Sequence, residues 1–183
     1  MLNRRNWVVL IVSLLLVASL AGCTATAVSM PDRPITVDVQ TALDAQNMAM
    51  SGLMAGSLEL DESQFSSLLS VLLEQNGGEN NPVTGVNVWF EPDNQVFIRV
   101  NLKEGVLPAN FGNTLDLAGT IGVENNHVVV DLSQAGVGNM SVSGAALAPI
   151  NAQINAALAD PSLGVAANVT TDTGKLTVSL GGM

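Results

Sequence analysis

Apolar and polar residues alternate through the middle of the chain, from residue 83 to residue 133. Four stretches share the pattern, and their apolar sets are Val86, Val88 and Phe90; Val96, Ile98, Val100 and Leu102; Leu115, Leu117, Gly119, Ile121 and Val123; and Val128, Val130 and Leu132. A period of two predicts strands with one buried face and one wet face. Turn-forming residues at 92–94 and 124–126 join neighbouring strands, so the pattern predicts an antiparallel meander.

A helical period precedes this region. Five apolar side chains recur at helical spacing: Phe65, Leu68, Leu69, Leu72 and Leu73. Asp61 is a favourable N-cap with Gln64 as its capping-box partner, and the Asn-Gly-Gly sequence at 76–78 favours a helix end. Residues 58–60 alternate like a strand. The sequence therefore predicts a short strand followed directly by an amphipathic helix.

Two weaker helical patterns flank these elements. The first begins near Asp38 and has a loose apolar face made of Val39, Leu43, Met50, Leu53 and Met54. Its methionines favour core filling over an adaptable lipid-facing surface. The second ends at Asp160-Pro161 and has the stripe Leu147, Ile150, Ile154 and Leu158.

Two alternating stretches close the chain on either side of Gly174, which suits the left-handed position of a three-residue hairpin loop. Their apolar residues are Val165, Ala167 and Val169, then Leu176, Val178 and Leu180. The order is helix, helix, four strands, helix and two strands, without a parallel crossover pattern. We therefore expect an α+β fold, in which one curved antiparallel sheet of about six strands packs against amphipathic helices.

The N-terminus has the features of an export signal. Arg4 and Arg5 precede an apolar run at 7–20, which is shorter than the roughly 20 residues of a spanning helix. The run ends in Leu-Ala-Gly-Cys at 20–23, which resembles the bacterial lipobox. The resemblance implies that residues 1–22 are a lipoprotein signal peptide and that Cys23 is lipidated.

This interpretation divides the rest of the chain into a lipidated flexible tether at 23–34 and a single domain at 35–183. The eleven residues from Thr24 to Pro34 would span on the order of 18 Å as a flexible linker. Thr24 is not the Asp that such lipoproteins use for inner-membrane retention. We therefore expect a protein of the cell envelope, held by acyl chains and facing the periplasm or the exterior, at the outer membrane if the cell has one.

Composition narrows the functional classes. The 183 residues carry six Lys+Arg against sixteen Asp+Glu, for a net charge of −10, which argues against a nucleic-acid partner. One Cys and one His make a disulfide framework or a zinc site improbable, and we expect no metal and no cofactor. His127, Asp131 and Ser133 fall along one strand, roughly 6–7 Å apart at each two-residue step, so they form no catalytic relay. An enzyme is not expected.

Four segments together carry a family resemblance: Leu58–Leu72, Val83–Leu102, Pro149–Leu158 and Gly174–Leu180. They are similar to bacterial TULIP-like (tubular lipid-binding) proteins, many of which are lipoproteins. The resemblance covers roughly residues 55–181 and rests on apolar alternation. It implies a half-barrel in which a long helix packs on a curved sheet and lipid tails bind between them. The chain departs from the family in having few aromatic and many small residues, which leaves open whether the groove is open or filled.

The resemblance implies a groove lined by Phe65, Leu69, Leu72, Val88, Phe90, Ile98 and Val100. The expected function is a membrane-anchored lipoprotein that binds or transfers lipid or another hydrophobic ligand. The alternative is a structural or assembly lipoprotein that binds no ligand and acts through an envelope protein. Trp89 and Phe97 fall on the opposite strand face, where either the N-terminal helix covers them or they form a contact patch.

Overall fold

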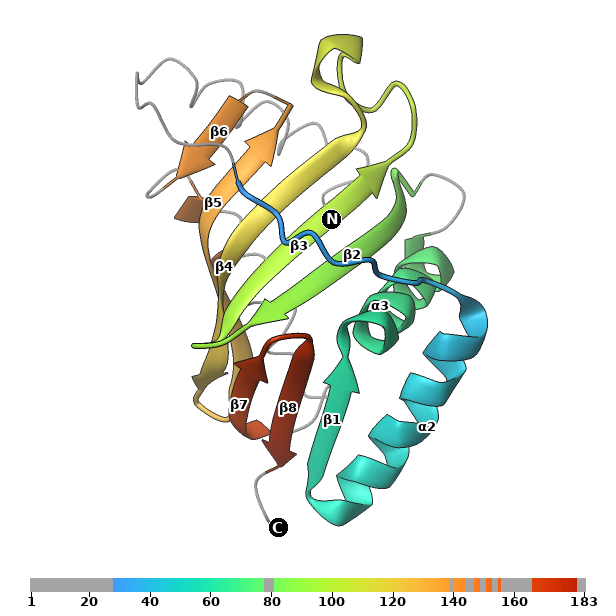
Figure 1. The fold of residues 1–183 in the computed structure, drawn as a ribbon, viewed down its shortest axis with the longest axis vertical. Helices are drawn as coiled ribbons and strands as arrows, with labels where there is room; N and C mark the ends of the chain where they lie inside the picture. The colour runs from blue at the N-terminus through green and yellow to red at the C-terminus, as the bar shows by residue number, and fades with distance from the viewer. Residues whose placement is uncertain are drawn as a thin grey trace, which may run out of the picture.

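The computed structural model describes residues 28–77, 81–138, 140–143, 147–148, 151–152, 155 and 166–180. The predicted signal peptide, Cys23 and most of the predicted helix near residues 147–158 lie outside these residues. The described elements, in order, are α2 (Val39–Ala55), β1 (Ser57–Asp61), α3 (Glu62–Gly77), β2 (Val83–Glu91), β3 (Gln95–Leu102), the 3-10 turn η1 (Ala109–Phe111), β4 (Thr114–Glu124), β5 (His127–Val137), β6 (Met140–Ser143), β7 (Ala166–Asp172) and β8 (Lys175–Leu180). This arrangement confirms the α+β class (Figure 1).

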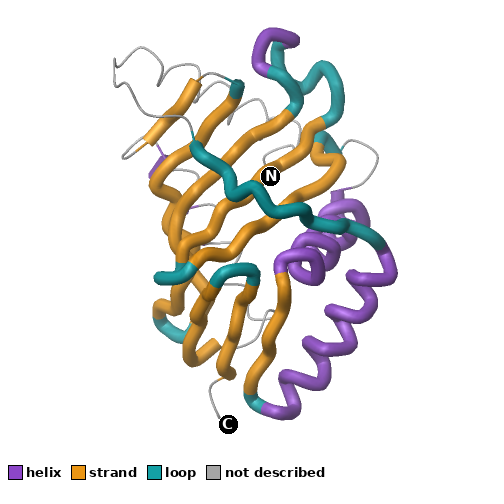
Figure 2. The backbone as a smooth tube through the Cα atoms, viewed as in Figure 1, coloured by secondary structure: helices purple, strands orange, loops and turns teal. Residues whose placement is uncertain are grey.

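The strands form two antiparallel sheets, so the prediction of one sheet is wrong. The larger sheet has the order β2-β3-β4-β5-β6, and the smaller has the order β1-β8-β7 (Figure 2). β1 pairs with β8, more than 100 residues later, because Leu58 and Leu60 stand opposite Val178 and Leu176. β6, which no sequence pattern indicated, extends the meander along the end of β5.

Local predictions for the meander and α3 are confirmed. The Asp61 backbone N–H donates to Gln64 Oε1 at 2.9 Å, and the Gln64 backbone N–H donates to Asp61 Oδ1 at 2.8 Å, which completes the capping box. The turns between β2 and β3 and between β4 and β5 each contain two left-handed residues, at 93–94 and 125–126. Asn and Asp tolerate this conformation, which matches the twist of a tight hairpin. Gly174 is also left-handed, at φ 80°, although its hairpin loop has two residues because Asp172 pairs with Lys175.

The core lies between the larger sheet, α3 and the smaller sheet. Its buried apolar residues are Val86, Val88, Phe90, Val96, Leu117, Ile121, Val130, Leu132, Ala135, Leu147, Val169 and Leu176. Those from the meander, except Ala135, belong to the apolar sets predicted from alternation. The period of two therefore identified the buried face of the sheet.

α2 does not bury the face that its sequence predicted. Val39 and Met50 are 64% and 63% exposed, and Leu43 is also exposed, whereas Ala42 and Ala45 are buried. The physical reason is close packing, since a Cβ on Gly52 would lie 2.7 Å from the backbone oxygen of Ser57. The helix therefore turns its small residues inward and leaves larger apolar side chains outside. The side chains of Leu53 and Met54 lie outside the described set.

Residues 28–38 form an extended strap that crosses the outer face of the larger sheet before α2 begins (Figure 1). Val28 lies against β5, where a Cβ on Gly136 would come within 3.6 Å of its Cγ2 atom. Trp89 is 5% exposed, and its indole N–H donates to the Arg33 carbonyl at 2.9 Å. The strap therefore covers Trp89, whereas the sequence predicted either cover by the N-terminal helix or an exposed contact patch. The segment expected as a free linker up to Pro34 contacts the domain from Val28 onward.

Helix side chains bond to the β2 edge of the larger sheet and to the first part of β5, which the shorter β6 leaves uncovered. Along α3, residues at four-residue spacing bond to alternate residues of β2: the Phe90 N–H donates to Glu62, the Val88 N–H to Ser66, and the Val86 N–H to Ser70. Along β5, the Leu132 and Val130 N–H groups donate to the side-chain oxygens of Asn151 and Asn155. Four helical residues rise about 6.0 Å and two strand residues about 6.6 Å, so the two spacings match. We call these two sets the edge ladders.

Ser66→Ala should destabilise the protein by about 1–3 kcal/mol, because the buried Val88 N–H would lose its acceptor at 2.8 Å. Urea unfolding followed by circular dichroism measures the difference. Ser51→Ala on α2 is the matched control, since Ser51 is exposed and its hydroxyl bonds only within its own helix. Equal stability of the two variants would contradict a role for the ladder.

Candidate functional site

The predicted groove residues lie on α3, on β2, along which α3 packs, and on the neighbouring strand β3. Six of them belong to one apolar cluster: Phe65, Leu69, Val88, Phe90, Ile98 and Val100. The β2–β3 register places Val88 opposite Ile98. The rings of Phe65 and Phe90 meet edge to face, with centroids 5.4 Å apart. Leu72 lies on α3, but its side chain is outside the described set.

Burial within this cluster is uneven. Val88 and Phe90 are 1% and 0% exposed, so protein atoms enclose them. Phe65, Leu69 and Ile98 stay half-buried although each packs against the core, and Val100 does the same. Six further half-buried side chains pack on this core: Leu73, Val83, Leu115, Val123, Val128 and Val178. The arrangement gives a closed apolar centre bordered by apolar side chains that retain contact with solvent.

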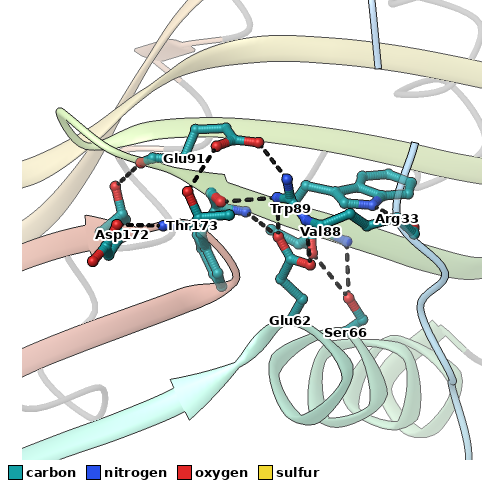
Figure 3. Close-up of polar contacts among 10 residues, drawn as sticks. Arg33, Glu62, Ser66, Val88, Trp89, Glu91, Asp172 and Thr173 are labelled. Carbon is teal, nitrogen blue, oxygen red and sulfur yellow. Dashed lines mark hydrogen bonds and ion pairs between the residues drawn. The ribbon is translucent and has the colours of Figure 1, made fainter. Parts of the chain in front are cut away.

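A polar junction joins the strap to the end of β2 (Figure 3). Arg33 is its centre, with Nη2 2.6 Å from Glu62 Oε1 and Nη1 2.6 Å from Glu91 Oε1. Nη2 also donates to the Phe90 carbonyl at 3.1 Å. Hydrogen bonding to Glu62, only partly opposed by burial and reinforced by Glu91, raises the pKa of Arg33 above its ordinary value. We call Arg33, Glu62, Glu91 and the Phe90 backbone the Arg33 junction.

The β7–β8 hairpin also reaches this junction. The Gly174 N–H donates to the Phe90 carbonyl at 3.0 Å, and the Glu62 N–H donates to the Gly174 carbonyl at 3.2 Å. The hydroxyls of Thr171 and Thr173 donate to the carbonyl and the carboxylate of Glu91. Because protein groups bond to both carboxylates and to the guanidinium, the arrangement fixes four chain segments: the strap, α3, β2 and the β7–β8 hairpin.

Sequence reasoning did not assign Arg33 or Glu62 to any site. A signal for Glu62 does exist, because Glu62, Ser66 and Ser70 repeat every four residues as a polar line beside the apolar face of the helix. No comparable local signal marks Arg33, since the strap has no hydrophobic period. Its partners come from α3 and β2 and become neighbours only on folding.

The groups that carry chemistry do not assemble in the described part of the chain. His127 begins β5 beside the 125–126 turn, and its buried Nδ1 has no hydrogen-bond partner among the described residues. Asp131 and Ser133 are exposed along the same strand. Within the described ranges, no three His, Cys, Asp or Glu side chains gather closely enough to hold a metal ion. The helices of these ranges also fall short of the length and hydropathy that a membrane crossing needs.

A separate shallow hollow of about 360 Å³ lies between α2 and β1. It is lined by Asn47, Met48, Ser51, Ser57, Leu58 and Glu59. Met48 is 42% exposed here, and Gln64 Nε2 lies 3.1 Å from its sulfur. With Met50 also exposed, the prediction that this methionine cluster fills the core is wrong for Met48 and Met50, whereas the side chain of Met54 lies outside the described residues.

The chain matches no family model, no curated protein and no solved structure.

Proposed function

We propose that this protein is a membrane-anchored extracytoplasmic lipoprotein that binds or transfers a lipid or another hydrophobic ligand. The ligand would lie along the apolar cluster between α3 and the larger sheet, in the manner of a TULIP-like half-barrel. One observation carries the proposal: Phe65, Leu69, Ile98 and Val100 remain half-buried beside the closed centre at Phe90. Partly covered aliphatic side chains next to a core form a surface that gains free energy from an apolar guest.

The free energy gained by burying an acyl chain is sufficient for binding without a headgroup contact. Burying about a dozen methylenes would contribute on the order of 10 kcal/mol before entropy losses. Most of the described cations offer little for a headgroup, because Arg33, Arg99 and Lys175 are each paired with a carboxylate and only Lys103 is left without an ion pair among the described residues. We therefore expect a ligand recognised by its apolar body.

Ile98→Trp should weaken ligand binding while the fold is retained, because the indole would occupy space in the middle of the cluster. The measurement is native mass spectrometry of the purified protein with a fatty acid or a phospholipid, together with urea unfolding. Thr120→Trp is the control, since it adds the same ring at an exposed position of β4. If wild-type protein binds no lipid at micromolar concentrations, the proposal fails. If Ile98→Trp instead lowers stability by about 1–3 kcal/mol, this position is already filled.

Cys23→Ser should abolish acylation and leave the protein either uncleaved at the inner membrane or released in soluble form. The reason is that the thiol is the acyl acceptor in the lipobox that residues 20–23 resemble. Incorporation of labelled fatty acid in cells measures the effect. Unchanged labelling of the variant would rule out this anchor.

The outer face of α2 favours a second candidate, a structural or assembly lipoprotein. Val39, Leu43 and Met50 are exposed on one side of the helix and provide an apolar contact for an envelope protein. The two candidates differ in what they require. A ligand-binding protein loses function through Ile98→Trp, whereas an assembly protein loses it through Leu43→Asp and Met50→Asp on the exposed helix face.

A further inference from the structure

The strap is fixed to the domain along its length. At its beginning, Val28 lies against Gly136 of β5. In its middle, the Arg33 junction and the Trp89 indole hold Arg33. Near its end, the Thr36 N–H donates to Ser63 Oγ at 3.2 Å, and the Ser67 hydroxyl donates to the Thr36 carbonyl at 3.3 Å. A segment held at these points does not act as a free linker.

Fixing the strap shortens the connection to the predicted anchor. Only five residue steps separate Cys23 from Val28, which is at most about 18 Å even when fully extended. The acyl chains on Cys23 would therefore hold the part of the domain near Val28 close to the bilayer.

The path of the meander defines which end of the domain this is. β3 and β5 finish, and β4 begins, at the end of the larger sheet that carries the 103–113 loop and the β5–β6 turn. Gly136 lies near the end of β5, and a Cβ on Gly138 would meet the η1 residue Phe111 at 3.1 Å. We call this the loop end of the sheet. The 92–94 and 125–126 turns lie at the opposite end, which we call the hairpin end (Figure 1).

Charge distinguishes the same two ends. Among the described residues, Lys103 is the cation for which no ion pair is found, and it is exposed on the 103–113 loop beside the exposed Glu104, so these two charges offset each other. The hairpin end instead carries the exposed carboxylates of Asp93 and Glu124. An anionic leaflet repels the acidic turns of the hairpin end more strongly than the loop end, where Lys103 and Glu104 offset each other, so electrostatics favours the orientation that the strap imposes.

We propose that the loop end of the larger sheet faces the bilayer, with the strap holding the domain in this orientation and the acidic hairpin end pointing away. The surface that meets the lipid comprises the 103–113 loop and Gly138, which follows β5, and its partner is a phospholipid headgroup layer. This inference rests on the proposed lipid anchor.

Two single-cysteine variants test it. Asn110→Cys lies in η1 at the loop end, and Gln95→Cys lies at the start of β3 at the hairpin end; both replaced side chains are exposed amides. The seven residue steps from Gln95 to Leu102 alone separate the two ends by about 23 Å. Cys23 is the only natural cysteine, so after its acylation a thiol-reactive fluorophore labels one position.

The labelled mature proteins are placed in vesicles of equal parts phosphatidylethanolamine and phosphatidylglycerol that contain a headgroup-labelled acceptor lipid. Energy transfer should be clearly higher from position 110 than from position 95. Insertion of about twelve Gly and Ser residues between Ala27 and Val28 leaves the strap intact but lengthens the connection, so it should remove the difference.

Each outcome bears on a different part of the inference. Mass spectrometry first establishes whether the mature protein carries acyl chains; without them, both the anchor and this inference fall. Acylated protein with equal transfer from the two positions, or higher transfer from position 95, overturns the orientation and leaves the anchor standing. A difference that survives the insertion overturns the role of the strap.

Discussion

Phe90→Ala is expected to lower the free energy of unfolding by about 3–5 kcal/mol. Phe90 has no exposed surface and lies at the centre of the buried cluster, where its ring meets the edge of Phe65. Removing it deletes apolar contacts and leaves a cavity that the paired strands around it cannot readily close. Chemical unfolding in urea measures the loss.

Phe97→Ala is the control for this change, because Phe97 lies on β3 with its side chain on the other face of the sheet and is only half-buried. We expect a clearly smaller loss from the control. If the two variants lose the same stability, the α3 side of the sheet does not hold the principal core.

Glu62→Ala should cost about 3 kcal/mol. The change removes one of the two carboxylates paired with Arg33 and leaves the buried N–H of Phe90 without its acceptor at 2.8 Å. The cost stays moderate because Arg33 keeps Glu91 and is about one third exposed, so water screens its charge.

Two variants define the origin of this effect. Glu74→Ala removes an exposed carboxylate from the same helix and should change stability by no more than about 0.5 kcal/mol. Glu62→Gln keeps an oxygen for the Phe90 N–H and should recover part of the loss. An effect of Glu62→Ala no larger than that of Glu74→Ala would show that the Arg33 junction contributes little.

The elements that the sequence predicted correctly are those whose signals are local. The β2–β5 meander follows from alternation and from turns whose residues tolerate left-handed backbone at Asn94 and Asn126. The start of α3 follows from the reciprocal bonds of Asp61 and Gln64. The register of the β2–β3 hairpin then brings Val88 and Ile98 together, so most of the candidate site could be assembled from the chain alone.

The errors arise where distant segments decide the outcome. The exposed face of α2 depends on the approach of Gly52 to Ser57, which a search for large apolar residues cannot detect. The pairing of β1 with β8 joins two strands that are more than 100 residues apart in the sequence. The Arg33 junction unites groups from an irregular strap, a helix and a strand. Hydrophobic periodicity contains no information about contacts between segments that are distant in the sequence.

The edge ladders have a consequence for how copies of this protein behave when crowded. An open strand edge presents unpaired N–H and C=O groups, on which a strand of another molecule can assemble. In β2 and β5 these groups are already bonded to Ser66, Ser70, Asn151 and Asn155. A strand from another molecule would have to displace a helix and also pair in the correct register with β2 or β5. The polar positions of these helices therefore protect against aggregation along β2 and along the part of β5 that β6 leaves uncovered. Variants that remove these polar side chains should be the first to form intermolecular β-structure.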